Sequence, residues 1–254
     1  MSKLGAPLLE FDSLPSTNEL AKEMAASGAP EGTTILAREQ TLGRGRLGRS
    51  WASAAGQGLY MSVILRPAVE ARRFAVMTLA AAVSVAETLE GSFAIPADIK
   101  WPNDVMVSER KVCGILLETA SEGQNLEYAV LGIGVNLSQR EFPDELRNSA
   151  TSLFLESGRL IEPREFLWPL LDRLQYWYQV STDGPGPVLA RWEQMSSYAR
   201  GCAVRVTSVA KEFVGLTGGL SESGALIVQL VSGERIDLVS GEVSLRKLQV
   251  SDGA

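Results

Sequence analysis

The 254-residue chain contains no histidine and only two cysteines, Cys113 and Cys202. Without imidazoles, the Ser-His-Asp and Cys-His forms of nucleophilic catalysis are excluded, together with nearly all zinc sites. The two cysteines cannot build a disulfide framework and lack the paired spacing of metal ligands, so we expect no metal site made by the protein. Any reaction at this chain must therefore proceed without an imidazole base.

An excess of basic residues is also missing, as is a long uninterrupted apolar run. The net charge of −6 and the isoelectric point near 5.0 disfavour a nucleic-acid partner bound through bulk electrostatics. The longest apolar stretch, residues 74–89, is interrupted by polar side chains, and we expect it to be too short for a membrane span. Residues 1–9 lack the features of a signal peptide. We therefore expect a cytoplasmic protein that binds neither nucleic acid nor a membrane.

The most distinctive stretch, residues 43–51, has the sequence Gly-Arg-Gly-Arg-Leu-Gly-Arg-Ser-Trp and contains no acid. Its glycines allow positive φ angles and the close approach of a ligand to the backbone. Its guanidinium groups are forked, permanently charged donors that suit phosphate and carboxylate oxygens. The combination predicts a clamp for a small anion in a loop that is mobile when empty; an ordinary solvated basic loop is the alternative.

A dinucleotide site is a third interpretation of the same loop. Gly43, Gly45 and Gly48 fit G-x-G-x-x-G after a predicted strand at 33–37. The residues that follow predict another strand, at 59–65, and no helix. Because no helix N-terminus is then available for a pyrophosphate, this interpretation is disfavoured.

The rest of the chain predicts a mixed α and β protein with a β-rich end. Ser16 and Glu19 form a capping box for a helix at 16–26, which leaves Thr17 and Asn18 free to face a ligand. Short β runs between Gly/Ser turns predict a small barrel after a boundary near Arg200. Further helices are expected at 74–90 (closed by Gly91), 163–180 and 188–198, and strands at 112–118 and 128–137; Ser108–Lys111 is expected to be a polar turn.

Two other features indicate a site. Lys100 lies where Pro102 interrupts a strand. A lysine at this position is better explained by a nearby anion than by a structural role. Gly114, Gly132 and Gly134 lie inside predicted strands, where glycine marks close approach of a ligand or tight packing.

Taken together, these motifs resemble the biotin protein ligases over most of the chain. Each motif is weak alone, and the ordered set carries the resemblance. The motifs are Ser16-Thr17-Asn18, Gln40, residues 43–51, Lys100-Trp101-Pro102-Asn103-Asp104, Gly114-Ile115-Leu116-Leu117-Glu118, Gly132-Ile133-Gly134-Val135-Asn136 and Gly241-Glu242-Val243-Ser244-Leu245-Arg246.

The resemblance implies an α+β fold. Residues 1–199 would form a catalytic domain like the class II aminoacyl-tRNA and biotin synthetases, with a mixed sheet and flanking helices, and residues 200–254 an SH3-like β-barrel. The implied enzyme is a biotin ligase that uses Mg²⁺ and ATP. It would form biotinyl-AMP, release pyrophosphate, and transfer biotin to a lysine of a biotin carboxyl carrier protein such as that of acetyl-CoA carboxylase. Since the motifs begin at Ser16, we expect the monofunctional type, without the N-terminal DNA-binding domain of some members.

The resemblance also implies roles for individual residues. Lys100 would bridge the reacting carboxylate and phosphate, Arg44 and Arg46 would close over the intermediate, and Asp104 is a candidate base. The biotin site would comprise Ser16, Thr17, Asn18, Gln40, Arg44, Gly45, Arg46, Lys100, Gly114, Gly132 and Gly134. The ATP site would comprise Arg49, Trp51, Asn103, Asn136, Phe154 and Arg246, with Phe154 as the adenine partner.

Two alternatives remain open at this point. A lipoate or octanoate ligase would share the fold, and a biotin-binding module would hold the acid without chemistry. An exposed sheet edge would also allow a homodimer.

Overall fold

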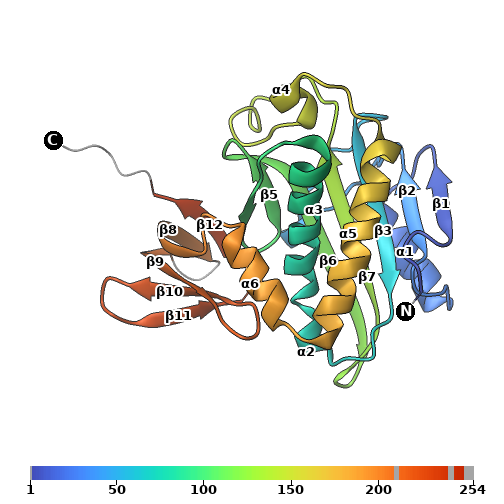
Figure 1. Ribbon diagram of the computed structural model, residues 1–254. Coiled ribbons are helices and arrows are strands. Elements are labelled where there is room, and N and C mark those ends of the chain that lie inside the picture. The colour runs from blue at the N-terminus through green and yellow to red at the C-terminus, as the bar shows by residue number, and fades with distance from the viewer. Residues whose placement is uncertain (1, 209–211, 240–242, 249–254) are drawn as a thin grey trace.

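The computed structural model describes residues 2–208, 212–239 and 243–248 and contains two sheets. The larger sheet has seven strands in the order β1-β2-β3-β7-β6-β5-β4. Within it, β1 and β2 are parallel and the other neighbours are antiparallel (Figure 1). Its strands are β1 (Leu8–Phe11), β2 (Thr34–Ala37), β3 (Gly58–Leu65), β4 (Asp98–Lys100), β5 (Asp104–Val107), β6 (Arg110–Glu122) and β7 (Asn125–Asn136).

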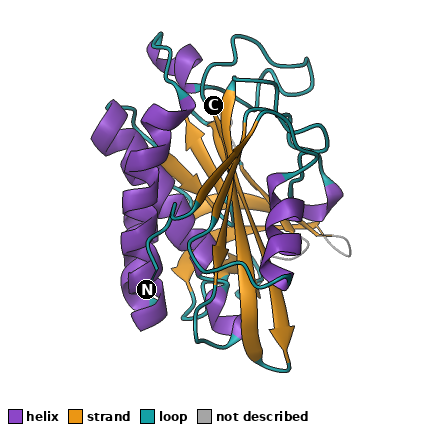
Figure 2. Cartoon of the chain, turned by 90° about the vertical axis from the view of Figure 1, so that its right-hand side faces the viewer, coloured by secondary structure: helices purple, strands orange, loops and turns teal. Residues whose placement is uncertain are grey.

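Helices cover both faces of this sheet (Figure 2). The helices α3 and α5 pack together on one face, where α3 also contacts β6, and α1 covers β3 and β7 on the other. The mixed sheet and flanking helices agree with the predicted fold class. The helices are α1 (Thr17–Ala26), α2 (Ala71–Phe74), α3 (Met77–Phe93), α4 (Leu153–Ser157), α5 (Pro163–Asp183) and α6 (Gly186–Gln194), with a 3₁₀ turn at Arg46–Gly48.

The central helix α3 is the most apolar part of the core. The helical stretch Ala71–Phe93 is long and apolar enough to cross a membrane by length and composition, so the expectation that it is too short is wrong. Of its most apolar part, 72% is buried in the protein, as is usual for the core helix of a globular domain. Gly91 does not close this helix: α3 continues to Phe93 and ends where Ala94 adopts a left-handed φ of 54°.

The start of α1 differs from the predicted capping box. Ser16 is the N-cap residue, but its side chain makes no capping hydrogen bond. Glu19 pairs with Lys22 and Arg44 instead.

The C-terminal unit is a five-stranded antiparallel sheet in the order β11-β10-β9-β8-β12. Among the described residues, no closed barrel is formed between β11 and β12. The Trp101 indole donates to Gly224 O at 3.1 Å across the two units, and the buried apolar core is continuous through both, so the division at 199/200 remains a prediction. The strands are β8 (Arg200–Ser208), β9 (Glu212–Leu220), β10 (Leu226–Leu230), β11 (Arg235–Leu238) and β12 (Val243–Lys247).

Candidate active site

A cavity of about 750 Å³ lies between the start of α1, residues 43–51, the β4–β5 turn and strands β6 and β7. We call residues 43–51 the Gly-Arg loop. The cavity brings together side chains from separate sequence motifs. The predicted site residues in its wall are Ser16, Thr17, Asn18, Gln40, Arg44, Gly45, Arg46, Arg49, Trp51, Lys100, Asn103, Gly114, Gly132, Gly134 and Asn136.

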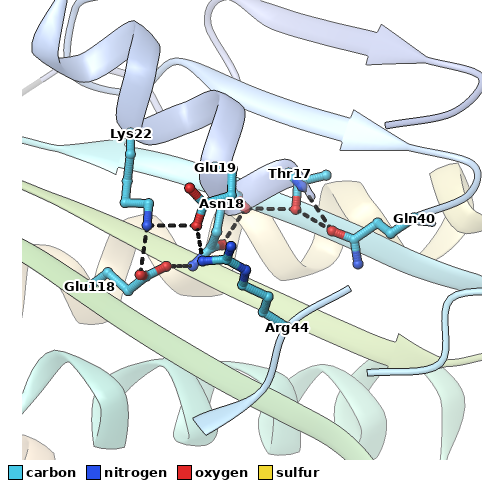
Figure 3. Close-up of polar contacts among 8 residues, drawn as sticks. Thr17, Asn18, Glu19, Lys22, Gln40, Arg44 and Glu118 are labelled. Atoms are coloured by element: carbon cyan, nitrogen blue, oxygen red, sulfur yellow. Dashed lines mark hydrogen bonds and ion pairs between the residues drawn. The ribbon is translucent and has the colours of Figure 1, made fainter. Parts of the chain in front are cut away.

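Thr17 and Gln40, both in the cavity wall, form a hydrogen-bonded pair (Figure 3). The backbone N–H and the hydroxyl of Thr17 both donate to Gln40 Oε1, at 2.8 and 3.0 Å. The other side of the Gln40 amide is fixed as well, because Nε2 donates to Ser53 Oγ at 2.8 Å. Thr17 is 3% exposed, so the orientation of these groups is set by the protein before a ligand arrives.

Asn18 is held from two strands. Its Oδ1 accepts from Ser62 Oγ of β3 at 2.6 Å, and its Nδ2 donates to Glu118 Oε2 of β6 at 2.8 Å. We call Thr17, Asn18 and Gln40 the polar end of the cavity. Their hydrogen bonds to the protein make this end a preformed surface of donors and acceptors.

An ion chain continues from Glu118 to the Gly-Arg loop (Figure 3). Lys22 Nζ lies 2.9 Å from Glu118 Oε1 and 2.7 Å from Glu19 Oε1, and Glu19 also accepts from Arg44. The hydrogen bond from Lys22 lowers the pKa of Glu19. Burial acts to lower the pKa of Lys22, but the hydrogen bonds to both carboxylates outweigh it and raise that pKa. Glu19 and Lys22 are therefore both charged at neutral pH.

The three strand glycines admit side chains that a Cβ would exclude. A Cβ on Gly132 would collide with Asn18 Oδ1. On Gly134 it would lie 2.5 Å from Trp51 Nε1, and on Gly114 it would lie 3.0 Å from Trp51 Cζ3. In this structure the groups that approach these glycines are the Asn18 and Trp51 side chains, and the approach of a ligand stays a prediction.

Basic side chains outnumber acidic ones in the cavity wall, six to four, although the whole chain has a net charge of −6. This local surplus favours anionic ligands. The basic residues are Arg44, Arg46, Arg49, Lys100, Lys111 and Lys247, and the acidic ones are Asp104, Glu109, Asp144 and Glu145.

Lys111 is a cavity residue that the sequence analysis missed. It belongs to β6, where a polar turn was expected. Its Nζ lies 2.6 Å from Asp104 Oδ1 and 5.2 Å from the centroid of the Trp51 ring. The same Nζ would be 3.2 Å from a Cβ on Gly114. The available signal in the sequence was the position of Lys111, three residues before Gly114. It points to the cavity only if the strand begins at Arg110, as it does in the structure.

Arg46 connects the Gly-Arg loop to the β4–β5 turn. Its Nη1 donates to Asn103 Oδ1 at 3.0 Å, and Asn103 Nδ2 donates to Ile115 O at 2.8 Å. Burial lowers the pKa of Arg46, but a guanidinium stays protonated at neutral pH. Asn103 is itself 8% exposed. It holds Arg46 in place through this hydrogen bond and also lines the cavity.

The Gly-Arg loop is folded as a small hairpin. The N–H of Gly45 donates to Arg49 O at 2.7 Å, and the N–H of Trp51 donates to Gly43 O at 2.9 Å. Its tip is open to solvent, since the Leu47 side chain is 56% exposed. The loop is held by these hydrogen bonds, by the hydrogen bond from Arg46 to Asn103 and by the ion pair of Arg44 with Glu19.

Of the predicted ATP residues, Phe154 is not in the cavity wall that the described residues form. Phe154 lies in α4 with the Arg140 guanidinium over its ring at 4.4 Å, so the structure does not bring it to the cavity. Phe142 lines the cavity instead. Arg246 lies in β12, and its side chain is outside the described residues.

Of the two cysteines, Cys113 is fully buried, and burial raises its pKa, which keeps it a thiol at neutral pH.

Comparison with known proteins identifies the family. Residues 10–136 match the biotin/lipoate A/B protein ligase family, and residues 201–246 match the biotin protein ligase C-terminal domain. The chain belongs to the biotin/lipoate A/B protein ligase family. The second match places it beside members of that family that carry the biotin ligase C-terminal domain.

Similar proteins bear ligase names. The chain is 37% identical over 235 residues to the bifunctional ligase/repressor BirA of Bacillus spizizenii, covering 91% of this chain and 71% of that protein. It is 34% identical over 228 residues to the biotin--[acetyl-CoA-carboxylase] ligase of Paracoccus denitrificans, with coverages of 87% and 93%. Its structure resembles the biotin protein ligase from Aquifex aeolicus in complex with biotin and ATP, with a TM-score of 0.80, 32% identity and coverages of 95% and 99%.

Proposed function

We propose that this protein attaches biotin to a lysine of a carboxylase carrier domain at the expense of ATP. The observation that carries the proposal is that the wall of one cavity combines preformed polar groups with six cationic side chains. Biotin has a polar ureido head and a carboxylate tail, which suit the polar groups and the cations, respectively. The similar ligases and the C-terminal domain match support the same assignment.

The first half-reaction joins two anions. A carboxylate oxygen of biotin attacks the α-phosphorus of ATP, the bond to the β-phosphate oxygen breaks, and pyrophosphate leaves. Two unit charges at about 4 Å repel by roughly 4 kcal/mol at an effective dielectric constant of 20. Lys100, Lys111 and Arg46 are the cavity cations that we assign to offset this repulsion. Fixed cations that stabilise developing charge suit a chain without histidine.

The second half-reaction is an aminolysis. The neutral amine of the carrier lysine attacks the acyl carbon of biotinyl-AMP, AMP leaves, and the amine loses a proton to solvent. The anhydride is already activated, so positioning supplies most of the remaining rate enhancement. Asp104 is a poor candidate base, because its carboxylate is paired with Lys111 at 2.6 Å; we assign it to orient Lys111.

A lipoate or octanoate ligase is the competing function. The alkyl chain of octanoate and the dithiolane ring of lipoate cannot hydrogen-bond to the donors and acceptors that Thr17, Asn18 and Gln40 still have free. Burying these polar groups without a partner is unfavourable. The polar end therefore favours biotin.

Several finer features belong to the same proposal. We propose Mg²⁺ as the companion of the ATP phosphates, acetyl-CoA carboxylase as the source of the acceptor domain, and the cytoplasm as the site of action. A monofunctional enzyme and a homodimer formed through a sheet edge are further proposals.

The test is pyrophosphate release from the purified protein with Mg-ATP and biotin, lipoate or octanoate, with and without a biotin carboxyl carrier domain. Biotin-dependent release, with multiple turnovers once the carrier is added and a mass increase of the carrier by one biotinyl group, is expected. Pyrophosphate release with lipoate but not with biotin would identify lipoate as the substrate. Biotin binding without release would indicate a binding module.

A further inference from the structure

The carboxylate of Glu118 lies behind the Asn18 amide. Glu118 Oε2 accepts from Asn18 Nδ2 at 2.8 Å, while Oε1 accepts from Lys22 at 2.9 Å. An ionised carboxylate only accepts hydrogen bonds. Glu118 therefore allows one orientation of the Asn18 amide, the one that turns Nδ2 toward it.

The other neighbour of the amide does not make this choice. Ser62 Oγ lies 2.6 Å from Asn18 Oδ1 and 2.8 Å from Thr17 Oγ1. Because its one hydroxyl hydrogen can go to either neighbour, this serine tolerates both orientations of the Asn18 amide. Gly132 leaves room for the amide without selecting its direction. Among the described contacts of Asn18, the Glu118 carboxylate is the one that distinguishes nitrogen from oxygen.

The orientation matters for the ligand. Asn18 is 4% exposed and lines the cavity, and each of its two polar atoms keeps hydrogen-bonding capacity beyond its protein partner. A fixed amide thus offers a donor at one place and an acceptor at another. The geometry points to Glu118 as a positioning residue that fixes the Asn18 amide and thereby sets the preference for a urea head group. This inference rests on the proposed function.

Replacing the carboxylate by an amide should reverse the choice. In Glu118→Gln, Lys22 attracts the new amide oxygen, so the Gln nitrogen is left to face Asn18 Nδ2. The Asn18 amide must then turn round or keep two donors opposed. We expect the dissociation constant of biotin to rise by about 10- to 100-fold, as for a mispaired buried hydrogen bond.

Removing Lys22 should rescue this variant. In Lys22→Met with Glu118→Gln, the Gln is free to turn its oxygen toward Asn18, so biotin binding should recover most of the loss. Lys22→Met alone should cost less than Glu118→Gln, because the carboxylate remains. The matched control is Glu87→Gln, a half-buried glutamate that pairs with Arg191 on the far helix layer and should leave biotin binding unchanged.

The measurement is calorimetric titration of the full chain with biotin and with an analogue whose urea oxygen is replaced by an imine nitrogen. The ratio of the dissociation constant of the analogue to that of biotin measures the preference for biotin. We expect Glu118→Gln to reduce this ratio and the double variant to restore it. Equal losses for both ligands, or a double variant weaker than either single one, would overturn the positioning role and indicate a structural one. If the wild-type protein itself did not bind biotin, both this role and the proposed function would fall.

Discussion

The polar end of the cavity and the Gly-Arg loop are held in different ways. At the polar end, Asn18 is 4% exposed and is fixed by hydrogen bonds from two strands. In the Gly-Arg loop, Leu47 at the tip is 56% exposed, and Arg44 is held by an ion pair with Glu19 at the start of α1. From this difference we expect preformed groups to recognise biotin and the exposed Gly-Arg loop to open and close around the reacting groups. Ordering such a loop costs about 1–2 kcal/mol per residue, which binding of both substrates would offset.

The largest expected effect is at the lysine that the structure added to the site. Lys111→Met removes a fixed cation beside the reacting groups, so biotin-dependent pyrophosphate release should fall by about 10²–10³-fold. Biotin affinity at the polar end should change much less. Lys3→Met, at an exposed position, is the control, and a loss of less than about threefold in Lys111→Met would remove its assigned role.

The next effect concerns enclosure. Arg46→Met should lower pyrophosphate release by about 10- to 100-fold, the range for losing hydrogen bonds to a charged group, and should also release biotinyl-AMP into solution. Asn103→Ala should cause part of the same leak, because Asn103 holds Arg46. Free biotinyl-AMP is measured by chromatography after a single turnover. Retention of the intermediate in both variants would show that the loop does not enclose it.

Gly134→Ala tests how tightly the loop's aromatic residue is seated. The new Cβ would lie 2.5 Å from Trp51 Nε1, so Trp51 must move, at a cost of about 1–3 kcal/mol in the free energy of unfolding. Gly91→Ala is the control, because its nearest outside atom is 3.9 Å away and Ala in a helix should stabilise by roughly 0.5–1 kcal/mol. Urea denaturation measures both, and equal stabilities would contradict the packing described.

The smallest effect is the pH dependence of the ion chain. The pKa of Glu19 is lowered on folding, so its contribution is present above the unfolded pKa and is lost as pH falls through the folded one. The pKa of Lys22 is raised, so its contribution is lost only as pH rises through the folded value. Between about pH 5 and pH 10 both terms are present. Glu19→Gln should therefore lower the free energy of unfolding by about 0.2–1 kcal/mol at pH 7 and by nothing at strongly acid pH, where an unchanged difference would be inconsistent with this linkage.

Much of the fold could be predicted because local patterns and tertiary structure agree. The apolar run of α3, the glycine-marked strands β6 and β7 and the β-rich end have strong periodic or compositional signatures. Boundaries were weaker: Gly91 was taken as a helix end, but burial of Phe93 against the core carries α3 past it. A closed barrel was expected from composition, which does not specify how the edge strands meet.

The site could be predicted in part for a related reason. Motif residues such as Asn18 and Arg46 were found because their order along the chain is distinctive. Lys111 was missed because it was assigned to a polar turn, and its place in the cavity depends on the register that pairs β6 with β5 and β7. Phe154 was selected by its sequence position, and the packing of α4 with Arg140 directs it elsewhere.

The most direct test of the difference between the polar end and the Gly-Arg loop is hydrogen exchange of backbone amides. It would be measured with no ligand, with biotin, and with biotin and Mg-ATP. We expect the amides of residues 43–51 to exchange fast without ligand and to slow strongly when both substrates are present. The amides of β7 around Gly132, already paired with β3 and β6, should be protected throughout. If the loop amides were equally protected in all three states, or the strand amides changed as much as the loop, the account of a preformed polar end and a closing loop would be contradicted.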